Sequence, residues 1–122
     1  MHSLKRGDTW IFEYQVLDYD NNPIDVRDWE IRAEISKGEE SLKKANDKVT
    51  GGHDSQIEVL DSEGNIKITF QKEDTDDLEI SIYKFEVEIT SIEDIYGNKH
   101  RFTIISETIK VIEDIIQWED IE

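Results

Sequence analysis

Hydrophobic and polar residues alternate along most of this chain, and a period of two residues is typical of half-buried β-strands. The clearest example is residues 83–90, where an aromatic or aliphatic side chain stands at every second position. The same alternation predicts four more strands, over residues 10–16, 30–36, 57–59 and 66–70. Two further strands are predicted where β-branched side chains accumulate, over residues 102–105 and 108–112.

Turn-forming residues separate these stretches. Residues 18–23 combine Asp and Asn with a Pro that cannot donate to a strand ladder, which predicts a reversal of the chain. Residues 61–65 are typical of a hairpin connection with Gly64 at positive φ, and residues 96–99 resemble them. Short strands at regular spacing, with such turns between them, predict an antiparallel β-sandwich rather than a βαβ sheet.

Two segments depart from the alternation. Residues 37–54 are long, polar and rich in glycine, which predicts a mobile excursion at one end of the sandwich. Within it, residues 39–45 could form one or two helical turns. Residues 73–78 are acidic and suited to capping, and they predict a short turn between strands.

The chain is long enough for one domain with a single two-layer core. Residues 1–122 are therefore interpreted as one β-sandwich domain, with 115–122 as a C-terminal docking tail. The predicted core consists of inward-facing strand residues: Trp10, Phe12, Tyr14, Ile31, Ala33, Ile35, Ile68, Phe85, Val87 and Ile104.

The chain is strongly acidic, with 14 Lys and Arg against 30 Asp and Glu and a formal net charge of −16. Such a charge repels phosphate backbones and anionic lipids, so nucleic acids are not expected as partners. A solvated surface is the simplest interpretation, and a basic partner is the alternative. No apolar run approaches the length of a membrane span, so membrane insertion and a signal peptide are not expected.

Few motifs indicate a binding or catalytic function. Arg6-Gly7-Asp8 resembles an adhesion tripeptide but suits the turn before the first long strand. Asp18, Asp20 and Asn22 have the spacing that opens a calcium loop, yet Pro23 and Trp29 stand where the required Gly and Glu belong.

Other reactive residues are equally isolated. The chain has no Cys, its three His are scattered, and Glu86 and Glu88 are expected on an exposed strand face. We therefore predict no catalytic residue, no metal ligand and no cofactor.

The aromatic residues offer the best candidates for interaction. Trp29, Tyr19 and Tyr96 would form a sugar-stacking platform if they were exposed on one face, although Trp29 also suits the end of the core. Trp118 lies in the apolar tail with Ile115 and Ile116, where it could cover a sheet edge or dock onto a neighbouring copy.

Several motifs together resemble a family of phage and prophage structural domains. They are Gly7-Asp8-Thr9 before a long first strand, the acidic turn with Pro23 that leads to Trp29, and the strand over residues 31–35. The strand led by Tyr83, the turn over residues 96–98 and the strand over residues 108–111 complete the likeness, which covers about residues 4–114.

With these motifs, the chain resembles the immunoglobulin-like sandwich in the N-terminal region of phage baseplate upper proteins and related tail proteins. The resemblance implies an all-β, immunoglobulin-like antiparallel sandwich of about seven strands. It also implies a non-enzymatic component of a tailed phage or prophage particle that attaches to the tail or baseplate. The implied partners are other tail or baseplate proteins or copies of the chain itself. The implied location is the virion, assembled in the cytoplasm of the bacterial host.

Two alternatives of other classes stay open. A carbohydrate-binding module would need the three aromatic residues on one exposed face. An acidic mimic of DNA would need carboxylates spaced like phosphates, and it would bind a basic host nuclease or repressor.

Overall fold

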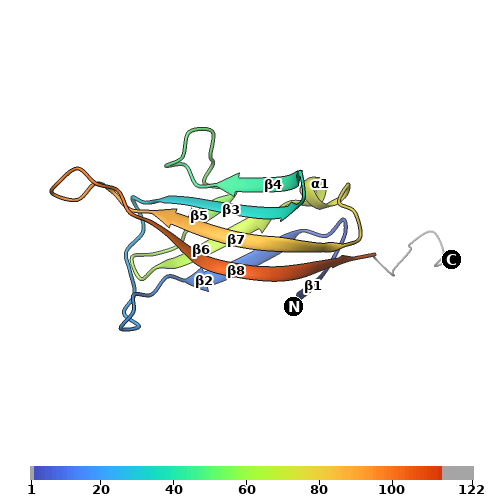
Figure 1. Ribbon diagram of the computed structural model, residues 1–122, viewed down its shortest axis with the longest axis horizontal. Coiled ribbons are helices and arrows are strands. Elements are labelled where there is room, and N and C mark those ends of the chain that lie inside the picture. Colours follow the sequence, from blue (N-terminus) through green and yellow to red (C-terminus); the bar gives the residue numbers. More distant parts are fainter. Residues whose placement is uncertain (1, 114–122) are drawn as a thin grey trace.

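Two β-sheets packed face to face make up the computed structural model, which describes residues 2–113 (Figure 1). The elements in chain order are β1 (His2–Lys5), β2 (Trp10–Gln15), β3 (Glu30–Lys37), β4 (Glu40–Ala45), β5 (Ile57–Val59), β6 (Asn65–Phe70), α1 (Lys72–Thr75), β7 (Ile82–Thr90) and β8 (Arg101–Ile112). None of the described helical structure is long and apolar enough to cross a membrane.

The sheets have the order β1-β8-β7-β3-β4 and β2-β6-β5. All neighbouring strands are antiparallel except β1 and β8, which run parallel. The chain crosses from one sheet to the other four times, between β1 and β2, β2 and β3, β4 and β5, and β6 and β7. These sheets correspond to strands B, E, D and C, F, G of an immunoglobulin domain, with β4 as an added edge strand. The predicted all-β, immunoglobulin-like sandwich is confirmed.

The core forms where the inner faces of the two sheets meet. Of the ten predicted core residues, seven are buried, and Phe12, Tyr14 and Ile104 are half-buried against them. The rings of Phe12 on β2 and Phe85 on β7 stack across the sheets with centroids 4.7 Å apart. In antibody domains a disulfide joins these two strands. In this chain, which has no Cys, stacked aromatic rings occupy the corresponding place.

A second immunoglobulin feature stands at the start of β7. The buried Tyr83 donates a hydrogen bond from its hydroxyl to the backbone oxygen of Glu79 at 2.9 Å. This is the geometry of a tyrosine corner, which ties the start of strand F to the segment that precedes it. Burial raises the pKa of Tyr83, so the hydroxyl keeps the proton that it donates. The corner did not emerge from the sequence pattern.

The crossover from β1 to β2 depends on Gly7 and Thr75. Gly7 has a φ of +85°, where a side chain would be strained, and its N–H donates to Thr75 Oγ1 at 3.0 Å. The Thr75 hydroxyl in turn donates to the backbone oxygen of Asp8 at 2.8 Å. Thr75 is buried at the end of α1, so the predicted turn over residues 73–78 contains a helical turn that anchors the first strands.

The prediction for residues 37–54 is partly wrong. The helical turns predicted over residues 39–45 are wrong, because residues 40–45 form the strand β4, which pairs antiparallel with β3. As an edge strand, β4 buries little of either face, and Leu42 is its one large apolar residue. This explains why its alternation was weak in the sequence.

The prediction of two C-terminal strands, over residues 102–105 and 108–112, is also wrong, because residues 101–112 form one continuous strand, β8. Val87 lies opposite Ile105 but Glu88 lies opposite Thr103, so Ile104 is an extra residue in a β-bulge. The bulge shifts the phase of the alternation, which made one strand resemble two. The short polar strand β1 was not predicted at all.

The predicted reversals are confirmed. Asp18 Oδ1 accepts hydrogen bonds from the N–H groups of Asp20 and Asn22, at 2.8 and 2.9 Å. Gly64 has a φ of +81° in the β5–β6 hairpin, and a Cβ there would lie 2.6 Å from the backbone oxygen of Val16. Only glycine therefore fits this turn.

Candidate functional site

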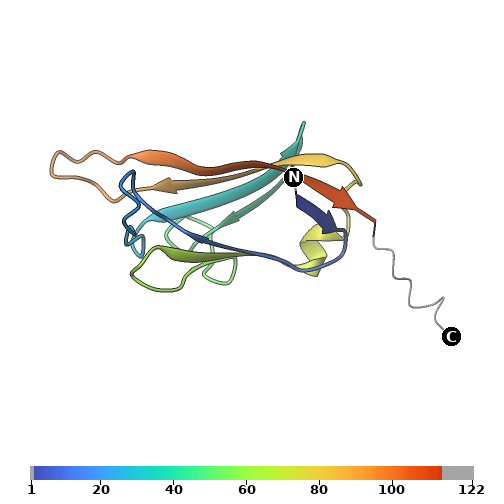
Figure 2. The ribbon, with the colours of Figure 1, turned by 90° about the horizontal axis from the view of Figure 1, so that it is seen from below.

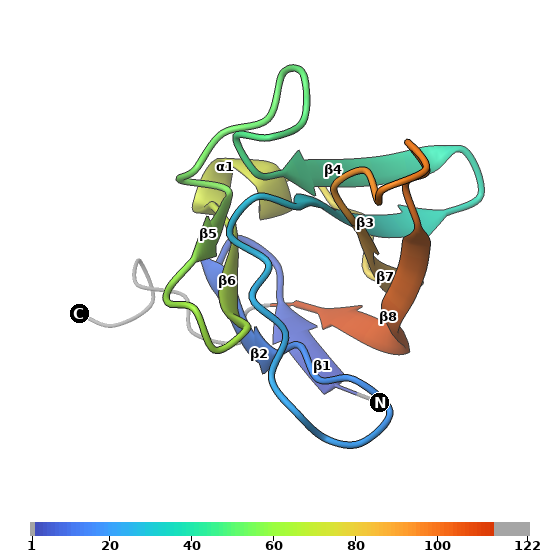
Figure 3. The ribbon, with the colours of Figure 1, turned by 90° about the vertical axis from the view of Figure 1, so that its left-hand side faces the viewer.

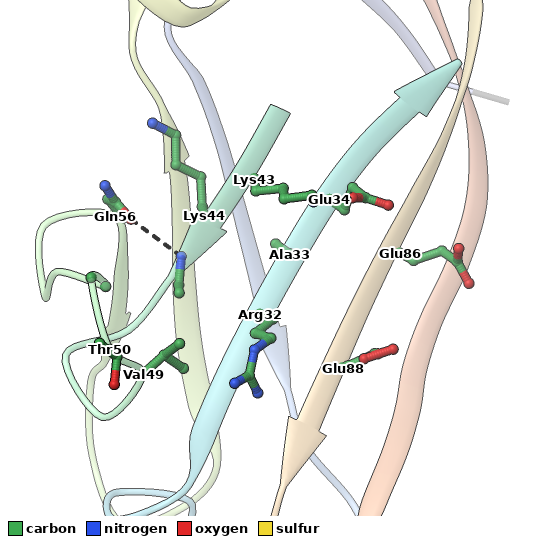
Figure 4. Close-up of a pocket in the computed structure, with 13 residues that line it drawn as sticks. Arg32, Ala33, Glu34, Lys43, Lys44, Val49, Thr50, Gln56, Glu86 and Glu88 are labelled. Carbon is green, nitrogen blue, oxygen red and sulfur yellow. Dashed lines mark hydrogen bonds and ion pairs between the residues drawn. The ribbon is translucent and has the colours of Figure 1, made fainter. Parts of the chain in front are cut away.

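A shallow hollow lies on the outer face of the five-stranded sheet, beneath the loop that joins β4 to β5 (Figure 4). Its volume is about 500 Å³. Most of its residues come from β3, β4 and β7, and the rest from the loop. The lining residues are Arg32, Ala33, Glu34, Lys43, Lys44, Ala45, Val49, Thr50, Gly51, Gly52, Gln56, Glu86 and Glu88.

Strand register sets the charges on this face. Glu34 lies opposite Lys43 on one side and Glu86 on the other, and Arg32 lies opposite Glu88. Lys43 Nζ is 3.7 Å from Glu34 Oε2, so part of the charge is compensated within the face.

The roof of the hollow is held at its base by a buried amide. The Asn46 side chain donates to the backbone oxygen of Trp29 at 2.7 Å and accepts from the N–H of Ile31 at 3.1 Å. Gln56 Oε1 accepts from the N–H of Ala45 at 3.2 Å, as the dashed line in Figure 4 shows. These bonds fix where the loop leaves β4 and where it returns.

The hollow offers little for catalysis. The residues that line it, all within the described part of the chain, include no His, Ser, Cys or Tyr. Glu86 and Glu88 are both on this outward face, as their alternation with buried residues predicted. Within residues 2–113 no group of three or more His, Cys, Asp and Glu side chains could hold a metal ion. The arrangement is suited to polar contacts with another surface.

The predicted interaction residues occupy different surroundings. Tyr19, in the β2–β3 connection, and Tyr96, in the β7–β8 connection, are 101% and 81% exposed. Both loops lie at the same end of the sandwich, but Figures 1 and 3 show them well apart. Trp29 is half-buried against the core just before β3. The three rings therefore do not form one platform.

The remaining predicted interaction residues, Trp118, Ile115 and Ile116, lie outside the described residues. The tail over residues 115–122 thus stays a prediction. In the β7–β8 connection, Ile95 next to Tyr96 is 91% exposed, and the sequence pattern did not indicate it as a candidate.

Sequence reasoning also missed an incomplete side of the sandwich, which we call the open side: the free edge of β2 and residues 101–108 of β8. Within the described chain, β2 pairs only with β6, and β1 pairs with β8 only over residues 109–112. Figures 2 and 3 show the short β1 lying between β8 and β2. β1 begins opposite Ile109, and before that start, toward residues 101–108 of β8, neither edge has a neighbour within residues 2–113.

Inward-facing side chains are exposed at the open side. Phe102 lies opposite Ile89 in the register, yet Phe102 is 45% exposed whereas Ile89 is 2% exposed. On the other sheet, Phe12 and Tyr14 are half-buried although their partners on β6 are fully buried. The apolar interior is therefore incompletely covered on this side.

A carboxylate also faces inward at the open side. Glu107 lies opposite the buried Phe85, and its buried Oε2 has no hydrogen-bond partner in residues 2–113. The nearest basic group is the His2 ring, whose Nε2 is 3.4 Å away. Burial and the negative charge of Glu107 raise the pKa of Tyr14 to about 12. A sign of this feature in the sequence was a Glu at an inward position of the β8 alternation.

Comparisons with known proteins add little. No family model matches the chain, and no curated protein matches it. A crystal structure described as that of a "putative glycoside hydrolase" from Bacteroides vulgatus ATCC 8482 aligns with 92% of this chain and 17% of its own, at 13% identity and a TM-score of 0.45. A likeness of this degree carries no argument about function.

Proposed function

We propose that the chain is a non-enzymatic structural module that acts through protein–protein contacts in the particle of a tailed phage or prophage. Its neighbours would be other tail or baseplate proteins or further copies of the chain. On this proposal the protein resides in the virion after assembly in the host cytoplasm.

The open side is the observation that carries the proposal. It combines two unpaired strand edges with apolar side chains that face inward but are not covered. Unpaired edges are ready templates for another chain, and proteins that do not use them usually block them. A rigid sandwich with such an edge is suited to holding a neighbour in a defined orientation.

The assignment to a phage particle is supported by the motifs of the family resemblance. Gly7 and Asp8 form the crossover that carries the chain from β1 to β2, and Asp18 stabilises the turn after β2. These motif residues therefore stabilise the fold, as expected for a family of structural proteins without catalytic residues.

Mass spectrometry of purified particles tests this proposal. Particles induced from the strain that encodes the chain should contain it in a fixed ratio to the major tail proteins. Its absence from particles that are otherwise complete, or turnover of a substrate by the purified protein, would overturn the proposal.

The charge of −16 favours one second candidate, an acidic mimic of DNA. Such a protein would bind a basic nucleic-acid-binding protein through exposed charges, so salt should weaken the complex steeply. Titration of the complex with salt distinguishes this function from an edge-mediated contact, which depends on backbone hydrogen bonds and apolar burial.

A further inference from the structure

The open side is defined by how β8 is paired. β8 has 12 residues, and β1 pairs with only the last four. We call residues 109–112 the covered half and residues 101–108 the uncovered half. The uncovered half is long enough for an added strand of ordinary length.

Within residues 2–113, the sandwich also lacks a second strand beside β2. In constant-type immunoglobulin domains, strand A pairs with strand B at this edge. Here the first strand, β1, pairs with β8 instead, and β2 has β6 as its one described neighbour. The inner faces of both sheets are therefore accessible from the same side, which explains the exposure of Phe102, Phe12 and Tyr14.

The surroundings of Glu107 indicate which kind of side chain a partner would place at the open side. A buried carboxylate oxygen without a hydrogen bond is costly unless a donor or a positive charge compensates it. His2 is close to this oxygen, but both side chains are partly exposed and no hydrogen bond joins them. A Lys or Arg side chain entering from the open side would compensate the carboxylate, because it carries both donors and charge.

We propose that the uncovered half of β8 accepts an extended segment of a partner protein as an added strand, with a Lys or Arg of that segment bound to Glu107. The alternate side chains of the segment would be apolar and would cover Phe102, Ile105 and Phe12. The inference rests on the proposed function as a contact module and names the chemistry of the partner.

Charge distinguishes this occupant from two others. A second copy of the chain would bring another net charge of −16 to the same edge, which disfavours pairing between identical edges. Residues 114–122 contain no Lys, Arg or His, so this segment could not compensate Glu107. A basic extended segment would pair with the backbone of the strand edge and compensate the charge of Glu107. The negative electrostatic field of the chain would also attract such a segment to it.

Peptide binding followed by NMR tests the inference on the full chain. The probe is the end-blocked peptide Lys-Thr-Val-Thr-Lys-Thr-Val-Thr-Lys, whose alternate residues place a central Lys between two Val. The matched peptide has Glu in place of the central Lys. The Lys peptide should shift the amide signals of residues 101–108, and the Glu peptide should bind about tenfold more weakly.

Two variants identify the carboxylate. In Glu107→Gln the two peptides should bind nearly alike, because the charge that distinguishes them is gone. Glu58→Gln removes the same charge from an exposed position of β5, far from β8 in the sheet order, and should keep the preference for Lys. Equal binding of both peptides to the unmodified chain, or a preference that Glu107→Gln leaves intact, would overturn the inference.

The other occupants give different results. Removal of residues 114–122 would shift the amides of residues 101–108 without any peptide if that segment occupied the edge. A dimer in sedimentation whose interface protects these amides would show a second copy there. Either result, or the absence of shifts at millimolar peptide, overturns the inference. Presence of the chain in particles is a separate measurement, so the proposed function can stand when this inference fails.

Discussion

The two halves of β8 both direct apolar side chains toward the interior, but their surroundings differ. In the covered half, Ile109 and Val111 are fully buried beneath β1. In the uncovered half, Phe102 faces the same interior but is 45% exposed. Side chains of equal apolarity thus differ because a neighbouring strand is present over one half and absent over the other.

The core of the domain is therefore incompletely covered along the uncovered half of β8, although Ile31, Ile66 and Ile89 near the same end are buried. At the end near α1, the buried Thr75 and the tyrosine corner of Tyr83 surround the covered half. At the opposite end, the exposed loops with Tyr19 and Tyr96 adjoin the uncovered half. The covered half is therefore enclosed by packed neighbours, whereas the uncovered half has the greater capacity for contact.

The largest expected effect comes from truncating one apolar side chain in each half. Ile109→Ala should lower the free energy of unfolding by about 2–5 kcal/mol, because it leaves a cavity among fully buried neighbours. Phe102→Ala should cost about 1 kcal/mol or less, because much of that ring is already in water. Denaturant unfolding of both variants measures the difference. Equal losses would show that the halves are equally packed.

Loss of the Thr75 hydroxyl should loosen the covered half. Thr75→Val leaves the Gly7 N–H and the Asp8 carbonyl without their partner, at a cost of about 2 kcal/mol. Because these groups hold the crossover after β1, amides of residues 109–112 should exchange with solvent faster. Thr103→Val, at an exposed site on β8, is the control and should change neither quantity. Unchanged exchange in Thr75→Val would contradict the role of the crossover.

A smaller effect is expected at the tyrosine corner. Tyr83 lies opposite Ile109, so it belongs to the covered half. Tyr83→Phe removes the hydrogen bond to Glu79 and should lower stability by about 1 kcal/mol in chemical denaturation. Tyr96→Phe, which alters an exposed ring, should have no measurable effect. Equal stabilities of the two variants would show that the corner bond adds nothing.

The smallest effect is at the open side and depends on alkaline pH. The pKa of Tyr14 is raised from 10.0 to about 12 by burial and by Glu107. The unfolded chain therefore loses this proton first, so the stability that Tyr14 contributes is present below pH 10 and is lost as the pH rises toward 12. Since Tyr14 is only half-buried, screening reduces the loss to less than about 1 kcal/mol.

Comparison with two variants isolates this titration. Tyr14→Phe should lack that part of the alkaline decline. Glu107→Gln should make it smaller, because the pKa of Tyr14 in the folded chain would lie closer to its value in the unfolded chain. An identical pH dependence in the unmodified chain and in Tyr14→Phe would disprove the link between Tyr14 and Glu107.

Much of the fold could be predicted from local pattern. Period-two alternation identified five strands at nearly their observed positions, and the Asp18 and Gly64 turns follow from the conformations that those residues favour. The missed or altered elements are β1, β4 and the single β8, which are an edge strand, another edge strand and a bulged strand. Edge strands bury only part of one face, so their sequences carry a weak signal.

The candidate sites were less predictable for the same reason. Tyr19 and Tyr96 were recognised as candidates and are exposed, but the open side depends on which strands are neighbours. Nothing in the residues around Phe102 or Glu107 indicates that β1 pairs with β8 only from Ile109 onward.

By itself, the amino-acid sequence determined that the chain forms an all-β sandwich, because alternation makes each strand apolar on one face and two such faces must cover each other. Only the tertiary structure decided that β1 joins β8 rather than β2, and that Glu107 faces the interior where the sandwich is open. Strand pairing between distant segments depends on backbone groups that every residue carries, so side-chain patterns cannot distinguish one free edge from another.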